Sequence, residues 1–213
     1  EILESMGAKI YTVENPVVEI SSTDLRRMLI LRCAGEHLPA AVKDYIEENQ
    51  LYGTGQNLKD LDLDQLEQWV VSLLKPSRIA HVLGCRDTAV SMAKHWGADA
   101  TDAARAALLH DITKEFTTEK QLQICNEFGI ITTKQDILTP KTFHAKTAAV
   151  LIPVLYPEFD DCEVVSAVRW HTTGNDNMTV LEKIVYLADY IDETRKYDDC
   201  IALREMFFSE KPE

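Results

Sequence analysis

The chain has 213 residues, of which 46% are hydrophobic and 27% charged, and its formal net charge is −13. This composition is typical of a globular protein with one large domain or two small ones. The acidic balance argues against passive binding to nucleic acid or to an anionic membrane, because both need a positive protein surface. We therefore expect neither among its partners.

Five cysteines are scattered along the chain and none forms a CxxC pair. Their spacing disfavours a cysteine zinc site and is typical of free thiols in a reducing compartment. No apolar run reaches the length of a membrane span. The sequence thus predicts a cytoplasmic protein.

Residues 1–56 combine a strand pattern with two predicted helices. Residues 9–13 (KIYTV) alternate as a strand does, and residues 17–20 form a second apolar run. One helix is capped by a hydroxyl side chain within residues 21–23, and another opens at Pro39. Residues 53–57 (GTGQN) have the composition of a linker, which predicts a second domain over residues 57–213.

The second part has apolar residues at helical spacing and no convincing strand. Residues 130–143 are predicted to form a loop. Helices are expected over residues 60–74 and 76–96, from a cap at Thr101 to residue 110, from a cap at Thr117 or Thr118 to residue 128, and over residues 144–155, 160–171 and 178–194.

Six histidine and aspartate residues lie inside or at the ends of these helices. Ligands from different helices that converge inside a bundle are a common metal architecture. Imidazole and carboxylate suit Fe, Mn, Zn, Co or Ni, and such ions can polarise a phosphate and activate water. The six residues are His81, His110, Asp111, His144, His171 and Asp189.

Ordinary structural roles compete with this interpretation. Neighbouring helical residues point about 100° apart, so His110 and Asp111 reach one ion only near the helix surface or at a frayed end. His95 lies about 21 Å along its helix from His81, too far to share an ion, and we assign it a structural role. Asp189 borders an apolar stripe, where a carboxylate is costly unless it is paired or bound to metal.

Several longer segments resemble one branch of the HD-domain metal-dependent phosphohydrolases. This branch is the YqeK family of symmetrical bis(5'-nucleosyl)-tetraphosphatases, and the resemblance covers roughly residues 75–208. It implies an all-helical fold and cleavage of diadenosine tetraphosphate to two molecules of ADP. The segments are AALLHDITKE (106–115), FHAKTAA (143–149), AVRWHTTGNDNMTVLEKIVYLADYIDETR (167–195) and LREMF (203–207).

The resemblance assigns a role to each candidate site residue. One or two divalent transition ions are implied, with iron or manganese favoured. The family's metal ligands fall on His81, His110, Asp111 and Asp189, while His144 and His171 match histidines that hold a second ion or contact phosphate. The resemblance implies that Lys114 and Arg195 neutralise phosphate charge, and that Thr172 and Thr173 lie in a turn that lines the substrate. The residues implied to be catalytic are Asp111, Lys114, His144 and His171.

One residue departs from the family pattern. Cys85 stands where a valine is expected, one turn from His81. This substitution bears on local packing and leaves the ligand set intact.

The N-terminal segment has a separate resemblance. VVEISSTDLRRML (17–29) and LPAAVKDYIEENQLYG (38–53) are similar to the C-terminal end of nicotinate-nucleotide adenylyltransferases. In that family the segment matching Ile20–Arg26 helps bind ATP phosphates at a helix N-terminus. The phosphate-binding start of that family is absent here, so we expect no adenylyl transfer. The expected fold is an all-α HD-domain bundle preceded by a small α/β remnant of a Rossmann-like nucleotidyltransferase.

Two other functions stay open at this point. One is an HD-type nucleotidase acting on mononucleotides, and the other is a non-catalytic adaptor that senses nucleotides. The ligand set favours an enzyme over an adaptor, because a binding module does not need it. The expected partners are a dinucleoside polyphosphate or ADP, and a homodimer is also considered.

Overall fold

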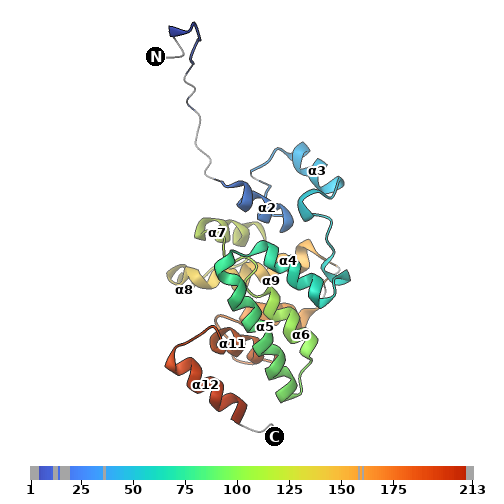
Figure 1. The fold of residues 1–213 in the computed structure, drawn as a ribbon, viewed down its shortest axis with the longest axis vertical. Coiled ribbons are helices and arrows are strands. Elements are labelled where there is room, and N and C mark those ends of the chain that lie inside the picture. The colour runs from blue at the N-terminus through green and yellow to red at the C-terminus, as the bar shows by residue number, and fades with distance from the viewer. Residues whose placement is uncertain are drawn as a thin grey trace.

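The computed structural model describes residues 5–11, 14, 20–35, 37–157, 159 and 161–209, and all regular structure within them is helical (Figure 1). This confirms the all-α prediction for the bundle. The α/β remnant is not found in the described residues: residues 9–11 form no strand, and residues 12–13 and 17–19 lie outside them. None of the described helices is long and apolar enough to cross a membrane.

Within described residues 20–60, the N-terminal part forms short helical elements at one end of the molecule, opposite α12 (Figure 1). Ser21 caps the first of them, since its side chain accepts a hydrogen bond of 3.0 Å from the Asp24 N–H. A cap by one of the hydroxyl residues 21–23 was predicted, and the structure selects Ser21. The elements are α2 (Ser22–Ile30), α3 (Ala40–Glu48), η1 (Leu51–Gly53) and η2 (Leu58–Asp60).

The remaining elements form the bundle. The longest helix has Pro76 at its first position and ends at Gly97, whose φ of +71° suits a residue without Cβ. The next helix is capped by Asp99 rather than Thr101, because the Asp99 carboxylate accepts the Thr101 and Asp102 N–H groups. The elements are α4 (Leu63–Leu73), α5 (Pro76–Trp96), α6 (Ala100–Leu109), α7 (Thr118–Glu127), α8 (Lys134–Leu138), η3 (Pro140–Thr142), α9 (Phe143–Leu155), α10 (Cys162–Trp170), α11 (Val180–Ile191) and α12 (Asp198–Ser209).

The predicted loop over residues 130–143 is wrong in part, because it contains α8 and η3. Thr133 and Asp136 cap α8 reciprocally, each side chain accepting the other residue's backbone N–H. A helix of five residues is too short to show an apolar period, so pattern reading missed it.

The helices of the bundle pack around one apolar core. Helix α5 packs against α6 and α11, and α10 packs against α9 and α11. The apolar stripe predicted for α11 is confirmed, with Val185 and Ala188 fully buried. These contacts bring the start of α5, the end of α6, the start of α9, the end of α10 and the middle of α11 toward one region.

The N-terminal helix α2 shares this core. Met28 and Leu29 are buried in the same apolar cluster as the bundle helices. Arg32 Nη1 donates a 2.6 Å hydrogen bond to the Leu155 carbonyl, and the Tyr156 hydroxyl donates to the Ile30 carbonyl. Within the described residues, α2 is therefore anchored to the bundle, and the domain boundary after residue 56 stays a prediction.

The buried ion pair between Asp136 and Lys146 predicts a pH-dependent contribution to stability. Lys146 Nζ lies 2.6 Å from Asp136 Oδ1, and both residues are buried. Burial raises the pKa of Asp136, but hydrogen bonds from Lys146 and Thr133 outweigh it and lower the pKa from 3.8 to about 2. The carboxylate therefore stabilises the fold fully above pH 3.8, and this contribution disappears as the pH falls through 2.

We expect Asp136→Asn to lower the free energy of unfolding by about 2 kcal/mol near pH 7, because Lys146 stays buried without its counter-charge. Urea unfolding measured from pH 7 downward should show the full difference in unfolding free energy between the parent and Asp136→Asn as far as pH 3.8. Below pH 3.8 this difference should become smaller. Glu47→Gln is the control, since it removes an exposed pair with Lys43 and should change stability by less than about 0.5 kcal/mol. Equal stability of Asp136→Asn and the parent at pH 7 would contradict the prediction.

Candidate metal centre

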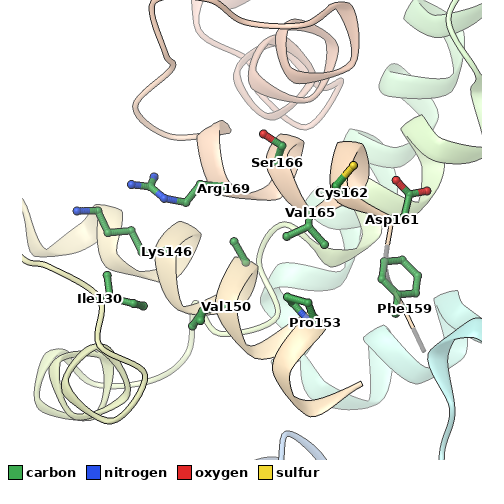
Figure 2. A pocket seen from close by; sticks show the side chains of 11 residues that line it. Ile130, Lys146, Val150, Pro153, Phe159, Asp161, Cys162, Val165, Ser166 and Arg169 are labelled. Atoms are coloured by element: carbon green, nitrogen blue, oxygen red, sulfur yellow. The ribbon is translucent and has the colours of Figure 1, made fainter. Parts of the chain in front are cut away.

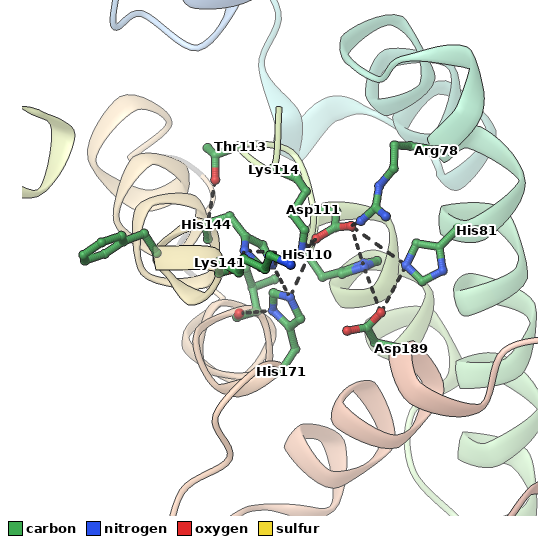
Figure 3. A network of polar contacts seen from close by, with 12 residues as sticks. Arg78, His81, His110, Asp111, Thr113, Lys114, Lys141, His144, His171 and Asp189 are labelled. Atoms are coloured by element: carbon green, nitrogen blue, oxygen red, sulfur yellow. Dashed lines mark hydrogen bonds and ion pairs between the residues drawn. The ribbon is translucent and has the colours of Figure 1, made fainter. Parts of the chain in front are cut away.

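Five helices bring the six predicted ligands together. His81 projects from the first turns of α5, and His110 and Asp111 follow the last residue of α6, so the frayed end considered above is the arrangement found. Figure 3 shows His81 on one side of Asp111 and His144 and His171 on the other. The remaining ligand, Asp189, comes from α11.

The Asp111 carboxylate lies at the centre of this group. It is 1% exposed, and its Oδ1 lies 3.1 Å from His144 Nε2 and 3.9 Å from His171 Nε2. Its Oδ2 lies 3.5 Å from His110 Nε2 and 3.9 Å from His81 Nε2. One carboxylate thus faces four imidazoles, one oxygen toward each pair.

Asp189 supplies a second carboxylate on the His81 side. Its Oδ1 lies 3.1 Å from His81 Nε2 and 3.9 Å from His110 Nε2. Arg195 Nη2 donates a 3.1 Å hydrogen bond to the same oxygen. The apolar border position of Asp189 is therefore explained by its charged partners.

Each of the four imidazoles is held through its Nδ1 atom. Three of them donate to the backbone carbonyl three residues earlier: His110 to Ala107 at 2.6 Å, His144 to Lys141 at 2.7 Å and His171 to Val168 at 2.7 Å. A carbonyl only accepts, so these rings carry a proton on Nδ1, and in the neutral ring Nε2 presents a lone pair. This is the orientation of metal-binding histidines in proteins.

Asp192 performs the same task for the fourth imidazole. His81 Nδ1 lies 3.1 Å from Asp192 Oδ2, and the Asp192 side chain is fully buried. Asp192 Oδ1 accepts a 2.9 Å hydrogen bond from the Thr194 N–H. A Cβ on Gly84 would lie 3.1 Å from this oxygen, so a residue without a side chain lets α5 approach Asp192.

The donor atoms fit a divalent cation. His81 Nε2, His110 Nε2 and Asp111 Oδ1 are buried, and beyond the contacts within the cluster given above they have no hydrogen-bond partner. His144 Nε2 and His171 Nε2 face each other at 3.0 Å, where two lone pairs repel unless a cation or proton lies between them. Two overlapping trios could hold an ion, His81 with His110 and Asp189, and His110 with Asp111 and His171.

The pKa shifts reflect the same concentration of negative charge. Burial lowers the pKa of His81, but Asp189 and Asp192 outweigh it and raise the pKa to about 9. Burial also raises the pKa of Asp111, yet His110 and His144 hold it well below its usual range. The carboxylates therefore attract positive charge at the His81 end of the site.

The other two histidines behave differently. Burial lowers the pKa of His171 to about 3, and the neighbouring His110 and His144 add to this effect. The pKa of His144 is also lowered, first by burial, although Asp111 opposes the shift. Neutral rings at His144 and His171 are in the state that binds a metal ion.

Basic side chains surround the two carboxylates. Lys114 Nζ lies 3.0 Å from His144 Nε2 and 3.6 Å from Asp111 Oδ1, as expected for a site residue, and Arg195 pairs with Asp189. Arg78 Nη2 also pairs with Asp111, although the sequence analysis did not select it. Arg78 lies three residues before His81, so both are expected on the same helix face, and this spacing could have identified Arg78 from the sequence.

A cavity of about 460 Å³ opens beside the His81 end of the site. Three further lining residues, which lie in the segment after α11, were not selected from the sequence: Thr194, Lys196 and Tyr197. No apolar period or motif marks these residues, and only the position of that segment beside α5 identifies them. The lining residues are Arg78, His81, Thr194, Arg195, Lys196 and Tyr197.

Not every predicted residue joins the cluster. Thr172 and Thr173 follow His171 in the turn after α10, and among the described residues neither makes a hydrogen bond to the cluster. His95 packs beside Trp96, Phe207 and Phe208, in line with its structural assignment.

Comparison with known proteins identifies the family. The HD domain model matches residues 78–194, which include all six candidate ligands. The chain belongs to the HD domain family. A solved structure from Clostridium acetobutylicum, described as a predicted HD superfamily hydrolase involved in NAD metabolism, is 34% identical, with a TM-score of 0.64 over 69% of this chain and 77% of its own.

Two curated relatives add to this assignment. A symmetrical bis(5'-nucleosyl)-tetraphosphatase from Bacillus subtilis is 32% identical over 62% of this chain and 70% of its own length. A probable nicotinate-nucleotide adenylyltransferase/Ap4A hydrolase from Mycoplasma pneumoniae is 24% identical over 76% of this chain and 42% of its own length. The protein is thus an HD-family hydrolase, while its N-terminal relation to adenylyltransferases stays a prediction.

We expect Asp192→Ala to weaken divalent metal binding by about 10- to 100-fold, because His81 then lacks the partner that orients its ring. Competition with a chromogenic chelator measures the affinity for Mn²⁺ or Fe²⁺. Asp199→Ala is the matched control, since Asp199 is an exposed carboxylate that accepts the Tyr190 hydroxyl. Equal metal affinity in both variants would show that Asp192 does not support the site.

Proposed function

We propose that this protein hydrolyses diadenosine tetraphosphate symmetrically to two molecules of ADP, with one or two iron or manganese ions at the site. The observation that carries the proposal is the convergence of four Nε2 atoms and two carboxylates, each imidazole fixed through its other nitrogen. His81, His110, Asp111 and Asp189 would hold the principal ion, and His144 and His171 a second ion or a phosphate.

Iron or manganese is proposed from the donor types. Imidazole and carboxylate without thiolate suit these ions. A bound ion of this kind would polarise a phosphate oxygen and lower the pKa of water. The chain itself then has to bind the polyphosphate and place a water in line with one phosphorus.

Asp111 would orient the attacking water as well as hold the ion. Its Oδ1 atom is buried and lies beside the imidazoles of His144 and His171. His144 and His171 are neutral acceptors at the same place and would orient the water. Symmetrical cleavage requires attack at an inner phosphate, so the cavity beside the site would hold one ADP unit.

Basic residues near the site would offset the repulsion between an acidic protein and an anionic substrate. A tetraphosphate chain is strongly anionic and the protein carries −13, so general attraction is unfavourable. Arg78, Arg195 and Lys196 line the cavity next to His81, and Lys114 lies at the His144 side. These groups would neutralise phosphate oxygens locally, with the arginines suited to contacts through two nitrogens.

We expect Asp111→Ala to lower kcat for diadenosine tetraphosphate by at least about 100-fold, because it removes both a metal ligand and the group that orients the water. Chromatography of the products from the Mn²⁺-loaded enzyme measures this rate and should show ADP as the sole nucleotide product of the parent. His95→Ala is the control outside the site. AMP with ATP as products, or a preference for mononucleotides, would overturn the substrate assignment.

We expect Lys196→Ala to raise KM for diadenosine tetraphosphate by about tenfold and to leave kcat within about twofold, because one charge-assisted contact to the polyphosphate is lost in both ground and transition states. Lys183→Ala removes an exposed lysine of α11 and serves as the control. An unchanged KM would place the phosphates outside this cavity.

A further inference from the structure

A second cavity lies away from the metal ligands, between the outer faces of α9 and α10. Its volume is about 610 Å³, within the range of small-molecule sites. Apolar side chains form most of its wall, with two basic residues at one end, as Figure 2 shows. The described lining comprises Ile130, Lys146, Ala149, Val150, Pro153, Phe159, Asp161, Cys162, Val165, Ser166 and Arg169.

The helical period explains how the two basic residues meet. On α9 the lining residues begin at Lys146 and recur every three or four positions to Pro153, and on α10 they run from Cys162 to Arg169 in the same way. Lys146 lies near the start of α9 and Arg169 near the end of α10. Because the two helices run in opposite directions along the cavity, both cations lie at the same end (Figure 2).

Arg169 lacks the partners that a guanidinium normally has. Among the described residues it makes no hydrogen bond or ion pair, and its Nη1 is buried without a partner. Its Cζ atom lies 4.1 Å from the centre of the Trp170 ring. Burial lowers the pKa of Arg169, and this effect exceeds the opposing influence of Asp136. A buried donor without an acceptor costs free energy, which an incoming acceptor would recover.

The charge at the basic end of the cavity indicates which kind of ligand fits it. Lys146 is neutralised by Asp136 at 2.6 Å, so one cation, Arg169, is left at this end of the cavity. A single cation at the end of an apolar cavity is complementary to a ligand that carries one anionic group on an apolar body. A dinucleoside tetraphosphate does not match, because its several negative charges would meet one guanidinium and a largely apolar surface.

We propose that this cavity binds a small carboxylate with an apolar body, its carboxylate on Arg169 and its body along Val150, Val165 and Phe159. The site is separate from the metal centre, because α9 and α10 present His144 and His171 to the centre and other residues to the cavity. It does not depend on the reaction proposed above.

Cys162 supplies a reporter inside the chain. It lines the cavity and is exposed, whereas the other four cysteines are buried. It lies seven positions before Arg169 on α10, or about 10 Å along the helix axis. A ligand whose carboxylate binds Arg169 therefore covers Cys162 only if its apolar body is long.

The test measures the rate at which N-ethylmaleimide labels Cys162, by mass spectrometry of the whole protein, with decanoate as the probe. Decanoate should slow labelling in a saturable way, acetate should not slow it, and decanol should need a concentration about tenfold higher, since it lacks the charge. The same decanoate protection is expected in Asp111→Ala, which separates this site from failure of the proposed hydrolysis.

Two variants distinguish the guanidinium from the apolar wall. Arg169→Gln should raise the decanoate concentration needed for protection about tenfold and leave the concentration of decanol needed unchanged. Arg105→Gln, on α6, is the control and should alter neither concentration.

Val165→Trp fills the cavity and should abolish decanoate binding, measured by calorimetry with the melting temperature as a check of folding. No protection by decanoate in the parent overturns the proposal. Equal affinity for decanol, or a self-association in the parent that Val165→Trp disrupts, overturns it in favour of an apolar contact surface.

Discussion

Asp111 is buried among four imidazoles, and the arrangement of the bundle serves to hold that carboxylate in place. Its neighbours come from α5, α6, α9 and α10, and Asp189 of α11 adds a second carboxylate nearby. The buried Asp111 carboxylate and the half-buried Asp189 carboxylate repel one another in a region of low dielectric constant, as do the facing lone pairs of His144 and His171. Only positive charge offsets this repulsion, which is why Arg78, Lys114 and Arg195 lie around the site and why its donor atoms suit a divalent ion.

Local backbone geometry orients the ligands. His110 and His171 each follow the last residue of a helix, where the unpaired carbonyls of the final turn accept from their Nδ1 atoms. His144 uses the carbonyl of Lys141 in the preceding 3₁₀ turn in the same way. His81 lies within a helix whose carbonyls are already bonded, so it needs a side chain from elsewhere, and Asp192 provides it. The helix ends and one buried aspartate thus fix four rings.

The same helices α9 and α10 present different chemistry on their two sides. Toward the centre they contribute His144 and His171, and toward the outside they form an apolar cavity with Arg169 at one end. This separation follows from the helical period, because residues three or four apart share a face. The N-terminal helix α2 covers another part of the bundle, where Met28 and Leu29 extend the common core.

The sequence by itself determined the helical bundle and most helix boundaries, and it selected the six candidate ligands with Lys114 and Arg195, because helical periods, caps and motif contexts are local patterns. Only the tertiary structure identified Arg78, Asp192, Lys196 and the cavity of Arg169, since each depends on which helix faces lie side by side. The short helix α8 and the cap at Asp99 were missed because one turn carries little pattern. Proximity between residues a hundred positions apart, such as His81 and Asp192, is set by the packing of α5 against α11 and has no trace in the spacing of the residues.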